Sequence, residues 1–394
     1  MATDTINSTL SASSDTNLIR CHECHFQVNV PKLANKQAAL CPRCKLQLTA
    51  YHQNGSQKII ALALTALVFL VASLPFEFLS FSASGQSQSI NLLNSFDVLI
   101  ENNYEILALL EAIFMLILPS SILLTLLYVL IPLELGFRLP KTDAAVDVIF
   151  LLIPWAMAEI FLIGVLVSLT KIMSLADIAI GLSFYAYVFF TIFMTITLYY
   201  VDKHQLKKSL NTNYVEIHSQ INKSLSVQKT WALLVTSVLL YIPANVLPIM
   251  HTNTLGNDEP STILGGVILL WKMGSYPIAI IIFIASVFVP LAKLFILCWL
   301  NYSVQVESDQ KKTERIYWYR VTEFVGRWSM VDVFVVAILV SLIQLDNLMS
   351  IVPGYAALAF CGVVICTMLA AITFDSRLIW LTSKTEKGRI INDG

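Results

Sequence analysis

Long apolar runs alternate with polar stretches along most of this chain, and these runs determine its predicted architecture. A helix needs roughly 20 apolar residues to cross a bilayer, and eight runs come near or above that length. The seventh run is the shortest and contains an acidic residue, so its limits are the least sharply defined. The runs predict membrane-spanning helices at about 59–79, 106–131, 148–170, 177–200, 231–250, 277–300, 326–346 and 354–374.

The overall composition supports a membrane protein with several spans. Of the 394 residues, 57% are hydrophobic and 13% are charged, whereas a soluble domain has about 25% charged residues. Such depletion of charge indicates that lipid surrounds much of the surface. The formal net charge of −1 gives no indication of nucleic-acid binding. We therefore expect an all-α polytopic membrane protein that does not bind nucleic acid.

The distribution of lysine and arginine predicts the orientation, because loops on the cytoplasmic side carry an excess of these residues. Of the 25 basic residues, 22 lie in the N-terminal segment, the C-terminal tail and alternate loops between the runs. The remaining loops contain only Lys171 and Lys272, and Lys293 lies inside a run. Both termini are therefore predicted to be cytoplasmic.

The second half of the chain repeats the first. The stretch "WAMAEIFLIGVLVSL" from Trp155 aligns without gaps with "WSMVDVFVVAILVSL" from Trp328. The same offset of 173 places Leu74-Pro75 on Leu247-Pro248. Each half begins and ends on the same side, so we expect two tandem four-helix repeats in parallel, related by an axis along the membrane normal.

These observations divide the chain into segments. The spans account for two transmembrane domains, and polar sequence separates them. The predicted segments are a disordered tail (1–17), a zinc ribbon (18–50), a first transmembrane domain (51–200), a cytoplasmic linker (201–230), a second transmembrane domain (231–380) and a cytoplasmic tail (381–394).

Two Cys-x-x-Cys pairs in the N-terminal segment predict a metal site. "CHEC" supplies Cys21 and Cys24, and "CPRC" supplies Cys41 and Cys44 after a gap of sixteen residues. This spacing is typical of a zinc ribbon, in which four thiolates hold one structural zinc ion. A module of about 30 residues has too small a core to fold alone, so the metal would stabilise it.

Other interpretations of these cysteines exist. "CHECH" matches the c-type haem pattern, but haem would leave the second pair unused and would need attachment outside the cytoplasm. "CPRC" also resembles a redox pair, although that would leave "CHEC" unexplained. His22 and His25 are spare ligands in principle; exposed knuckle residues are the simpler interpretation.

Ionisable residues within the predicted spans indicate a functional site, because burying a charge in lipid is costly. Lys293 and Asp332 lie at similar depths from the cytoplasmic ends of their spans, so a buried pair is a reasonable hypothesis. Ser286 shares a helical face with Lys293, and Ser329 shares one with Asp332. Thr367 reaches a comparable depth on the last span. The alternative is a purely structural pair in which Lys293 reaches towards the membrane surface.

Further polar residues lie in the spans. Asn245 lies between two prolines in "YIPANVLPI", where it either bonds a carbonyl freed by a proline or lines a cavity. Glu159 occupies the position of Asp332 in the first half and is a second candidate for cavity lining. We expect the acids near the outer ends of the first two spans, Glu77, Glu105 and Glu111, to lie at or near the membrane interface.

Several stretches resemble the PqiA/LetA family of bacterial inner-membrane proteins. They are "YIPANVLPIM", "VPLAKLFIL", "GRWSMVDVFVVAILVSL" and "FDSRLIW", and the similarity spans essentially the whole chain. The resemblance implies tandem PqiA-type domains after a zinc ribbon, and a polar network at Ser286, Lys293, Ser329, Asp332 and Thr367. Family members often carry a second ribbon between the halves, whereas 202–229 contains no cysteine here.

The resemblance also implies a function. Members of this family work with periplasmic MCE-domain proteins, so we expect a non-enzymatic subunit that passes phospholipid between the inner membrane and an MCE conduit. No nucleotide-binding Gly-x-x-x-x-Gly-Lys-Ser/Thr motif is present. One alternative is a small-molecule exporter or envelope-stress membrane protein without an MCE partner. Another is a membrane thiol oxidoreductase that uses "CPRC".

Overall fold

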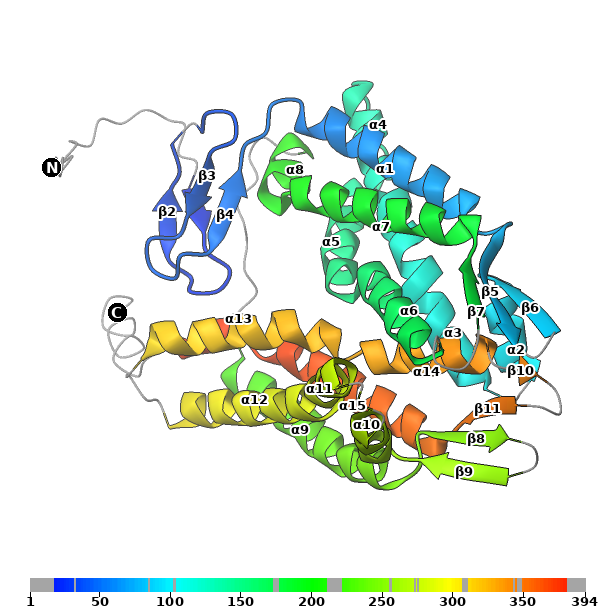
Figure 1. Ribbon diagram of the computed structural model, residues 1–394. Coiled ribbons are helices and arrows are strands. Elements are labelled where there is room, and N and C mark those ends of the chain that lie inside the picture. Colours follow the sequence, from blue (N-terminus) through cyan, green and yellow to red (C-terminus); the bar gives the residue numbers. More distant parts are fainter. Residues whose placement is uncertain are drawn as a thin grey trace, which may run out of the picture.

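The computed structural model describes most of the chain. The described residues are 18–31, 33–83, 86–101, 104–172, 177–210, 222–254, 257–272, 274, 276–306, 311–342, 344–345 and 349–380. The predicted tails 1–17 and 381–394, and positions 211–221 of the predicted linker, lie outside this set. The fold consists of a small N-terminal ribbon and two helical halves (Figure 1).

The ribbon contains two short antiparallel hairpins. The first pairs β1 (Leu18–Arg20) with β2 (Gln27–Asn29), and the second pairs β3 (Ala38–Leu40) with β4 (Gln47–Ala50). One Cys-x-x-Cys pair begins in the turn of each hairpin. Few large side chains are buried here besides the cysteines, Ile19 and Val30, so the module lacks an apolar core of useful size.

The two halves contain equivalent elements in the same order. In the first half these are α1 (Gly55–Ala72), β5 (Glu77–Ala83), β6 (Gln86–Asn91), α2 (Asn94–Glu101), α3 (Glu105–Ala112), η1 (Ile113–Ile117), α4 (Leu118–Glu134), α5 (Thr142–Leu152), η2 (Ile153–Trp155), α6 (Ala158–Ile172), β7 (Asp177–Ile180), α7 (Leu182–Tyr200) and α8 (Lys203–Leu210). In the second half they are α9 (Lys223–Val246), β8 (Met250–Thr254), β9 (Asn257–Ser261), α10 (Ile263–Lys272), α11 (Tyr276–Phe283), η3 (Ile284–Phe288), α12 (Val289–Gln305), α13 (Lys312–Trp328), α14 (Val331–Leu342), β10 (Gln344–Leu345), β11 (Met349–Pro353), α15 (Tyr355–Thr373) and η4 (Ser376–Ile379).

Seven helical segments of the described residues are long and apolar enough to cross a membrane. They confirm seven of the eight predicted spans, and the repeats confirm the fold class. The eighth, α14, has 12 residues. The prediction placed its start near 326, but residues 312–328 form the separate amphipathic helix α13, and α14 begins only after the turn at Ser329 and Met330. Residues 331–340 of α14 are all buried, so protein rather than lipid surrounds this short helix.

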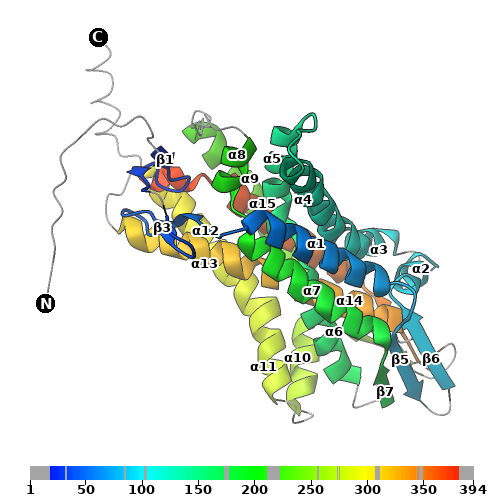
Figure 2. The same ribbon diagram turned by 90° about the horizontal axis from the view of Figure 1, so that it is seen from above.

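Two β-sheets lie at the end of the molecule remote from the ribbon, which we call the sheet end; the opposite end is the ribbon end (Figures 1 and 2). The sheet of the first half has the strand order β6-β5-β7, and that of the second half has the order β10-β11-β8-β9. The apolar runs did not predict these small sheets, which are an addition to the mostly helical fold. Residues 77–79 and 177–180, which the apolar runs assigned to spans, belong to strands instead, because β5 pairs with β6 on one side and with β7 on the other.

Equivalent π-helical turns interrupt the second long helix of each half. In the first half the turn is η1, and in the second half it is η3, which contains Ser286. A proline follows each turn at the equivalent position, Pro119 and Pro290, and lacks the N–H that would continue regular bonding. Such turns occur frequently at functional sites.

The two halves meet through the equivalent helices α6 and α14. Phe161 and Phe334 occupy equivalent positions, and their rings meet edge to face at a centroid distance of 5.6 Å. Gly164 allows the backbones to come close, because a Cβ there would lie 2.9 Å from Phe334 Cβ. Small residues serve this purpose in membrane helix pairs. The contact therefore has approximate two-fold symmetry, as the parallel repeats predict.

In each half, a glycine directly precedes the helix that follows the sheet. This glycine packs against the backbone near the start of the first strand of that sheet. A Cβ on Gly181 would lie 1.9 Å from Glu77 O, and one on Gly354 would lie 2.0 Å from Pro248 O. The amides of Gly181 and Gly354 also donate hydrogen bonds to Phe78 O and Ile249 O.

We expect Gly354→Ala to destabilise the protein, because the added methyl group would overlap a backbone oxygen that cannot rotate away. Overpacking costs typically 1–3 kcal/mol and more against backbone. Thermal unfolding in detergent should show a lower midpoint. Gly266→Ala is the matched control, since nothing lies within 4 Å of its Cβ position. An unchanged midpoint for Gly354→Ala would contradict this description of the contact.

Candidate functional site

The two cysteine knuckles have the same backbone geometry. In the first, the amide of His25 donates to Cys21 O at 2.9 Å; in the second, the amide of Lys45 donates to Cys41 O at 2.8 Å. His25 and Lys45 both adopt left-handed backbone angles, with φ of 56° and 59°. These turns direct both sulfur atoms of each pair to one side, towards the other hairpin.

The four sulfur atoms form one cluster that could hold a metal ion. Cys21 Sγ lies 3.5 Å from Cys44 Sγ, and Cys24 Sγ lies 3.5 Å from Cys41 Sγ. All four lie within 4.8 Å of one another and are buried. Zinc bound at about 2.3 Å by four thiolates in a tetrahedron would separate the sulfurs by about 3.8 Å. The residues therefore fit a four-thiolate metal site that uses both pairs at once.

The protonation of these thiols depends on a cation. Burial raises the pKa of Cys21, Cys24 and Cys44 to about 12. At neutral pH these three thiols would keep their protons unless a metal ion replaced them. His22 is exposed and His25 faces the membrane domain, so neither is needed to complete the cluster.

An ion pair attaches the first knuckle to the second half. Glu23, the third residue of "CHEC", is 7% exposed at its side chain and forms an ion pair with Arg320 of α13. Arg320 Nε lies 3.1 Å from both carboxylate oxygens, and Nη2 donates to Cys44 O at 2.9 Å. The guanidinium of Arg43 lies over the Trp380 ring at 4.2 Å from its centroid. Both knuckles therefore contact the second half directly.

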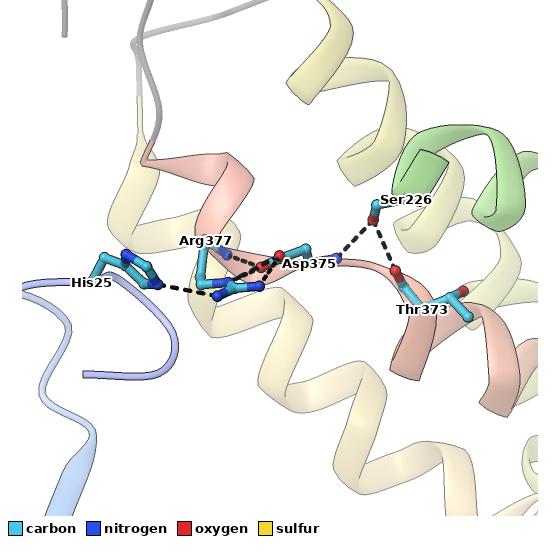
Figure 3. A network of polar contacts seen from close by, with 5 residues as sticks. All are labelled: His25, Ser226, Thr373, Asp375 and Arg377. Carbon is cyan, nitrogen blue, oxygen red and sulfur yellow. Dashed lines mark hydrogen bonds and ion pairs between the residues drawn. The ribbon is translucent and has the colours of Figure 1, made fainter. Parts of the chain in front are cut away.

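A second polar connection links the ribbon to the helices α9 and α15 (Figure 3). His25 Nε2 lies 3.1 Å from Arg377 Nη1, and Arg377 forms an ion pair with Asp375. The Asp375 amide donates to Ser226 Oγ at 3.2 Å, and the Ser226 hydroxyl donates to Thr373 O at 2.8 Å. The segment after α15 thus fixes the ribbon against the ends of two spans.

The ribbon also contacts the first half. The Ala50 amide at the end of β4 donates to Asp202 Oδ2 at 2.9 Å. The Gln205 side chain of α8 donates to Ala50 O and lies 3.5 Å from Thr49 Oγ1. The four-cysteine cluster therefore lies in a module that bridges the two halves at one end of the molecule.

A cavity of about 260 Å³ lies between the halves near the ribbon end. Its wall combines η2 of the first half with α12, α13 and α15 of the second half. The lining residues are Ile153, Pro154, Lys293, Arg320, Glu323, Phe324, Arg327, Met368, Ala371 and Ile372.

Lys293 is the buried charged residue of this cavity. It is 3% exposed, and its ammonium has no hydrogen-bond partner among the described residues. A Cβ on Gly326 would lie 2.5 Å from Lys293 Nζ, so the glycine of α13 provides the space that the ammonium occupies. Burying an ammonium group without a partner is unfavourable, and a bound anion would offset this cost.

The other charged residues of the cavity lie on α13 and have partners. Arg320 pairs with Glu23 of the ribbon, and Arg327 Nη1 lies 3.8 Å from Glu159 of α6. Burial and the nearby carboxylate of Glu23 raise the pKa of Glu323, the acid in the lining. The excess positive charge of the cavity therefore comes from Lys293.

The structure buries the five residues of the predicted polar network but does not join all of them. The Lys293 side chain lies against Gly326 of α13. Ser329 follows this glycine by three residues, and Asp332 follows it by six. Among the described residues, no carboxylate oxygen lies within 4.0 Å of Lys293 Nζ, so the suggested Lys293–Asp332 salt bridge is not formed here. Ser286 is buried in η3, and the Thr367 hydroxyl donates to Val364 O at 2.9 Å.

The remaining candidates have clear positions. The Asn245 side chain donates to Tyr241 O at 2.9 Å, one turn earlier in α9; this is not a carbonyl freed by Pro243 or Pro248, and Asn245 does not line the cavity at Lys293. Glu159 does not line the cavity itself but forms an ion pair with Arg327, which does. Glu111 is 2% exposed and therefore lies inside the protein; its place at or near the membrane interface stays a prediction.

Three charged residues of the site were missed in the sequence. Arg320 and Arg327 were counted only as basic residues of the cytoplasmic side, and Glu323 was not considered. Their spacing of three and four residues places them on one face of a helix, and this signal was available in the sequence.

The fold and the cavity define a polytopic membrane protein of two tandem repeats with an N-terminal module whose four cysteines could bind a metal. The chain belongs to the PqiA family: the family model described as "Paraquat-inducible protein A" matches residues 56–211 and 227–384.

Curated relatives cover nearly the whole chain. The "Intermembrane transport protein PqiA" of Escherichia coli (strain K12) is 39% identical, with 92% of this chain and 95% of that protein aligned. A "Probable intermembrane transport protein" of Haemophilus influenzae is 27% identical, over 94% and 97%. The "Lipophilic envelope-spanning tunnel protein A" of E. coli (strain K12) is also 27% identical, over 92% and 90%. No solved structure matches the chain.

We expect replacement of Cys21, Cys24, Cys41 or Cys44 by Ser to abolish binding of one metal ion per chain, because three thiolates leave the tetrahedron incomplete. Elemental analysis of the purified protein provides the measurement. Cys298→Ser is the control, since this thiol lies outside the cluster. A wild-type protein without bound metal would contradict the assignment.

We expect Glu23→Gln to loosen the ribbon, because Arg320 loses a buried ionic partner. Hydrogen exchange of amides in 18–50 should become faster while the metal content is unchanged. Glu314→Gln is the matched control, as that acid also pairs on α13 but is 59% exposed. Equal exchange rates in both variants would show that the ion pair does not attach the ribbon.

Proposed function

We propose that this chain is the inner-membrane subunit of an MCE-type lipid transport system, which passes phospholipid between the inner membrane and a periplasmic MCE-domain protein. The observation that carries the proposal is the cavity at Lys293, where a buried ammonium lies between the two halves of a membrane protein. The names of the relatives, which refer to intermembrane transport and to an envelope-spanning tunnel, support the same conclusion.

In this proposal the ribbon end faces the cytoplasm and the sheet end faces the periplasm. The excess of basic residues in the N-terminal segment, the tail and alternate loops supports this orientation. The helices α8 and α13, which carry many of these residues, lie beside the ribbon (Figure 2). The β-sheets would then be available to the periplasmic partner.

The residues of the cavity suggest how a lipid would be held. The phosphate of the headgroup would enter the cavity and accept a hydrogen bond from the ammonium of Lys293. This charge-assisted hydrogen bond would replace the hydration that the ammonium and the phosphate lose. Arg320 and Arg327 provide further donors at the wall. The apolar residues Phe324, Met368 and Ile372 line the side on which the acyl chains would remain in lipid.

The polar network supplies a way to release the lipid. Ser286, Ser329, Asp332 and Thr367 are buried around the junction of α12, α13 and α14. If α12 and α14 moved closer together, the carboxylate of Asp332 would compete with the phosphate for the ammonium of Lys293. Protonation of Asp332 would favour the lipid again, so proton flux would drive the cycle.

In the proposal the metal is zinc and its role is structural. The four-thiolate cluster is closed, with no position for a substrate. Zinc would stabilise the ribbon, and the ribbon would hold α13 and α8 together at the cytoplasmic face. This assignment predicts no redox chemistry at "CPRC", because Cys41 and Cys44 would both be ligands.

We expect Lys293→Met to reduce phospholipid transfer at least tenfold while raising thermal stability, because the variant removes a buried charge but keeps the length of the side chain. Transfer between donor vesicles and the purified complex provides the first measurement, and thermal unfolding provides the second. Lys272→Met, at an exposed lysine of α10, is the control. Full transfer by Lys293→Met would remove Lys293 from the mechanism.

We expect purification of the tagged chain from native membranes to recover an MCE-domain protein and phospholipid, both identified by mass spectrometry. The alternative of an exporter without an MCE partner predicts neither. Repeated recovery of the chain alone, from membranes in which the MCE protein is detectable, would contradict the proposed assembly.

A further inference from the structure

A buried glutamate in the first half has no role in the cavity at Lys293. Glu111 lies in α3, within the membrane-spanning segment Glu105–Glu134, and is 2% exposed. Its Oε2 atom is buried without a hydrogen-bond partner among the described residues. A carboxylate in such a place is costly, so a residue of this kind indicates function by default.

A small cavity of about 30 Å³ adjoins this carboxyl group near the sheet end. A water molecule needs roughly 10–15 Å³ by this measure, so the cavity has room for one or two. Its wall includes strands β5 and β6 and the contact between the halves. The lining residues are Phe78, Leu79, Ile90, Asn91, Leu92, Ser95, Glu111, Phe161 and Ile338.

The surroundings of Glu111 identify the ligand that it could bind. No basic side chain lines the cavity. On α7, Tyr187 is close, but its hydroxyl donates to Met115 O at 3.3 Å. On α2, Asp97 and Glu101 are exposed, and on α14 the titratable residue is Asp332, at the opposite end. Ca²⁺ and Mg²⁺ need about six oxygen ligands, so one carboxyl group among apolar side chains fits a proton instead.

We propose that Glu111 is a proton-binding site of the first half, open to the sheet end through the small cavity. The carboxylate takes a proton from hydronium to form the acid and later returns it to water, without oxidation or reduction. Ile338 in the cavity wall lies six residues after Asp332 on α14, a rise of about 9 Å. Glu111 therefore extends the buried polar residues from the cavity at Lys293 towards the opposite end. The use of this proton in transport rests on the proposed function, whereas proton binding itself does not.

Infrared difference spectroscopy of the full chain in lipid nanodiscs, between acid and alkaline pH, tests the proposal. We expect a carboxylic-acid C=O band typical of apolar surroundings that shifts in D₂O, titrates with pH and disappears in Glu111→Gln. Glu105→Gln, at an exposed acid of the same helix, should keep the band. A band that persists in Glu111→Gln, or its absence from the wild type, would overturn the proposal.

Carbodiimide labelling of the wild-type chain is a second test, and it does not depend on whether the variants fold. The reagent reacts with protonated carboxyl groups in apolar surroundings, so mass spectrometry should find it on Glu111 and not on Glu105, with less modification as pH rises. Absence of label on Glu111, or labelling that does not change with pH, would refute proton binding. Neither measurement uses lipid transfer, so failure of the transport function would be recognised separately.

Discussion

The cost of burying charge inside a membrane protein shapes the second half of this chain more than any other interaction. Lys293 is only 3% exposed, and no side chain of the described residues bonds to its ammonium. A glycine on α13 leaves space for the ammonium rather than a partner for it. An anion supplied from outside the chain would recover the lost interaction, and for this reason we propose that the cavity is a binding site.

The ribbon can be understood from the same constraint. The charged helix α13 cannot lie in lipid, so it needs a polar surface on its outer side. Glu23 provides a partner for Arg320, and a metal ion held by the four cysteines would fix the knuckle that carries Glu23. A chain of contacts therefore runs from the four cysteines through Arg320 to the wall of the cavity. In this account the metal would act on lipid binding by positioning α13, without contact to the lipid.

Much of the architecture was predictable from the sequence because its signals are long-range and strong. Apolar runs revealed seven spans, the two cysteine pairs revealed the ribbon, and the alignment at Trp155 and Trp328 revealed the repeat. The sheets were missed because strands such as Asp177–Ile180 continue directly into apolar helices, and periodicity cannot separate four residues from a span. The roles of Arg320 and Glu111 depend on tertiary contacts. One pairs with a residue 297 positions away, and the other is enclosed by strands that the sequence did not suggest.

Electron cryomicroscopy of the chain in phospholipid nanodiscs tests the central claim most directly. The account predicts headgroup density in the cavity between η2, α12, α13 and α15, with its phosphate within hydrogen-bond distance of Lys293 Nζ. The density should be absent from Lys293→Met under the same conditions. A cavity without lipid density, in which Lys293 is neutralised by Asp332, would contradict the account and make the buried charges a structural pair.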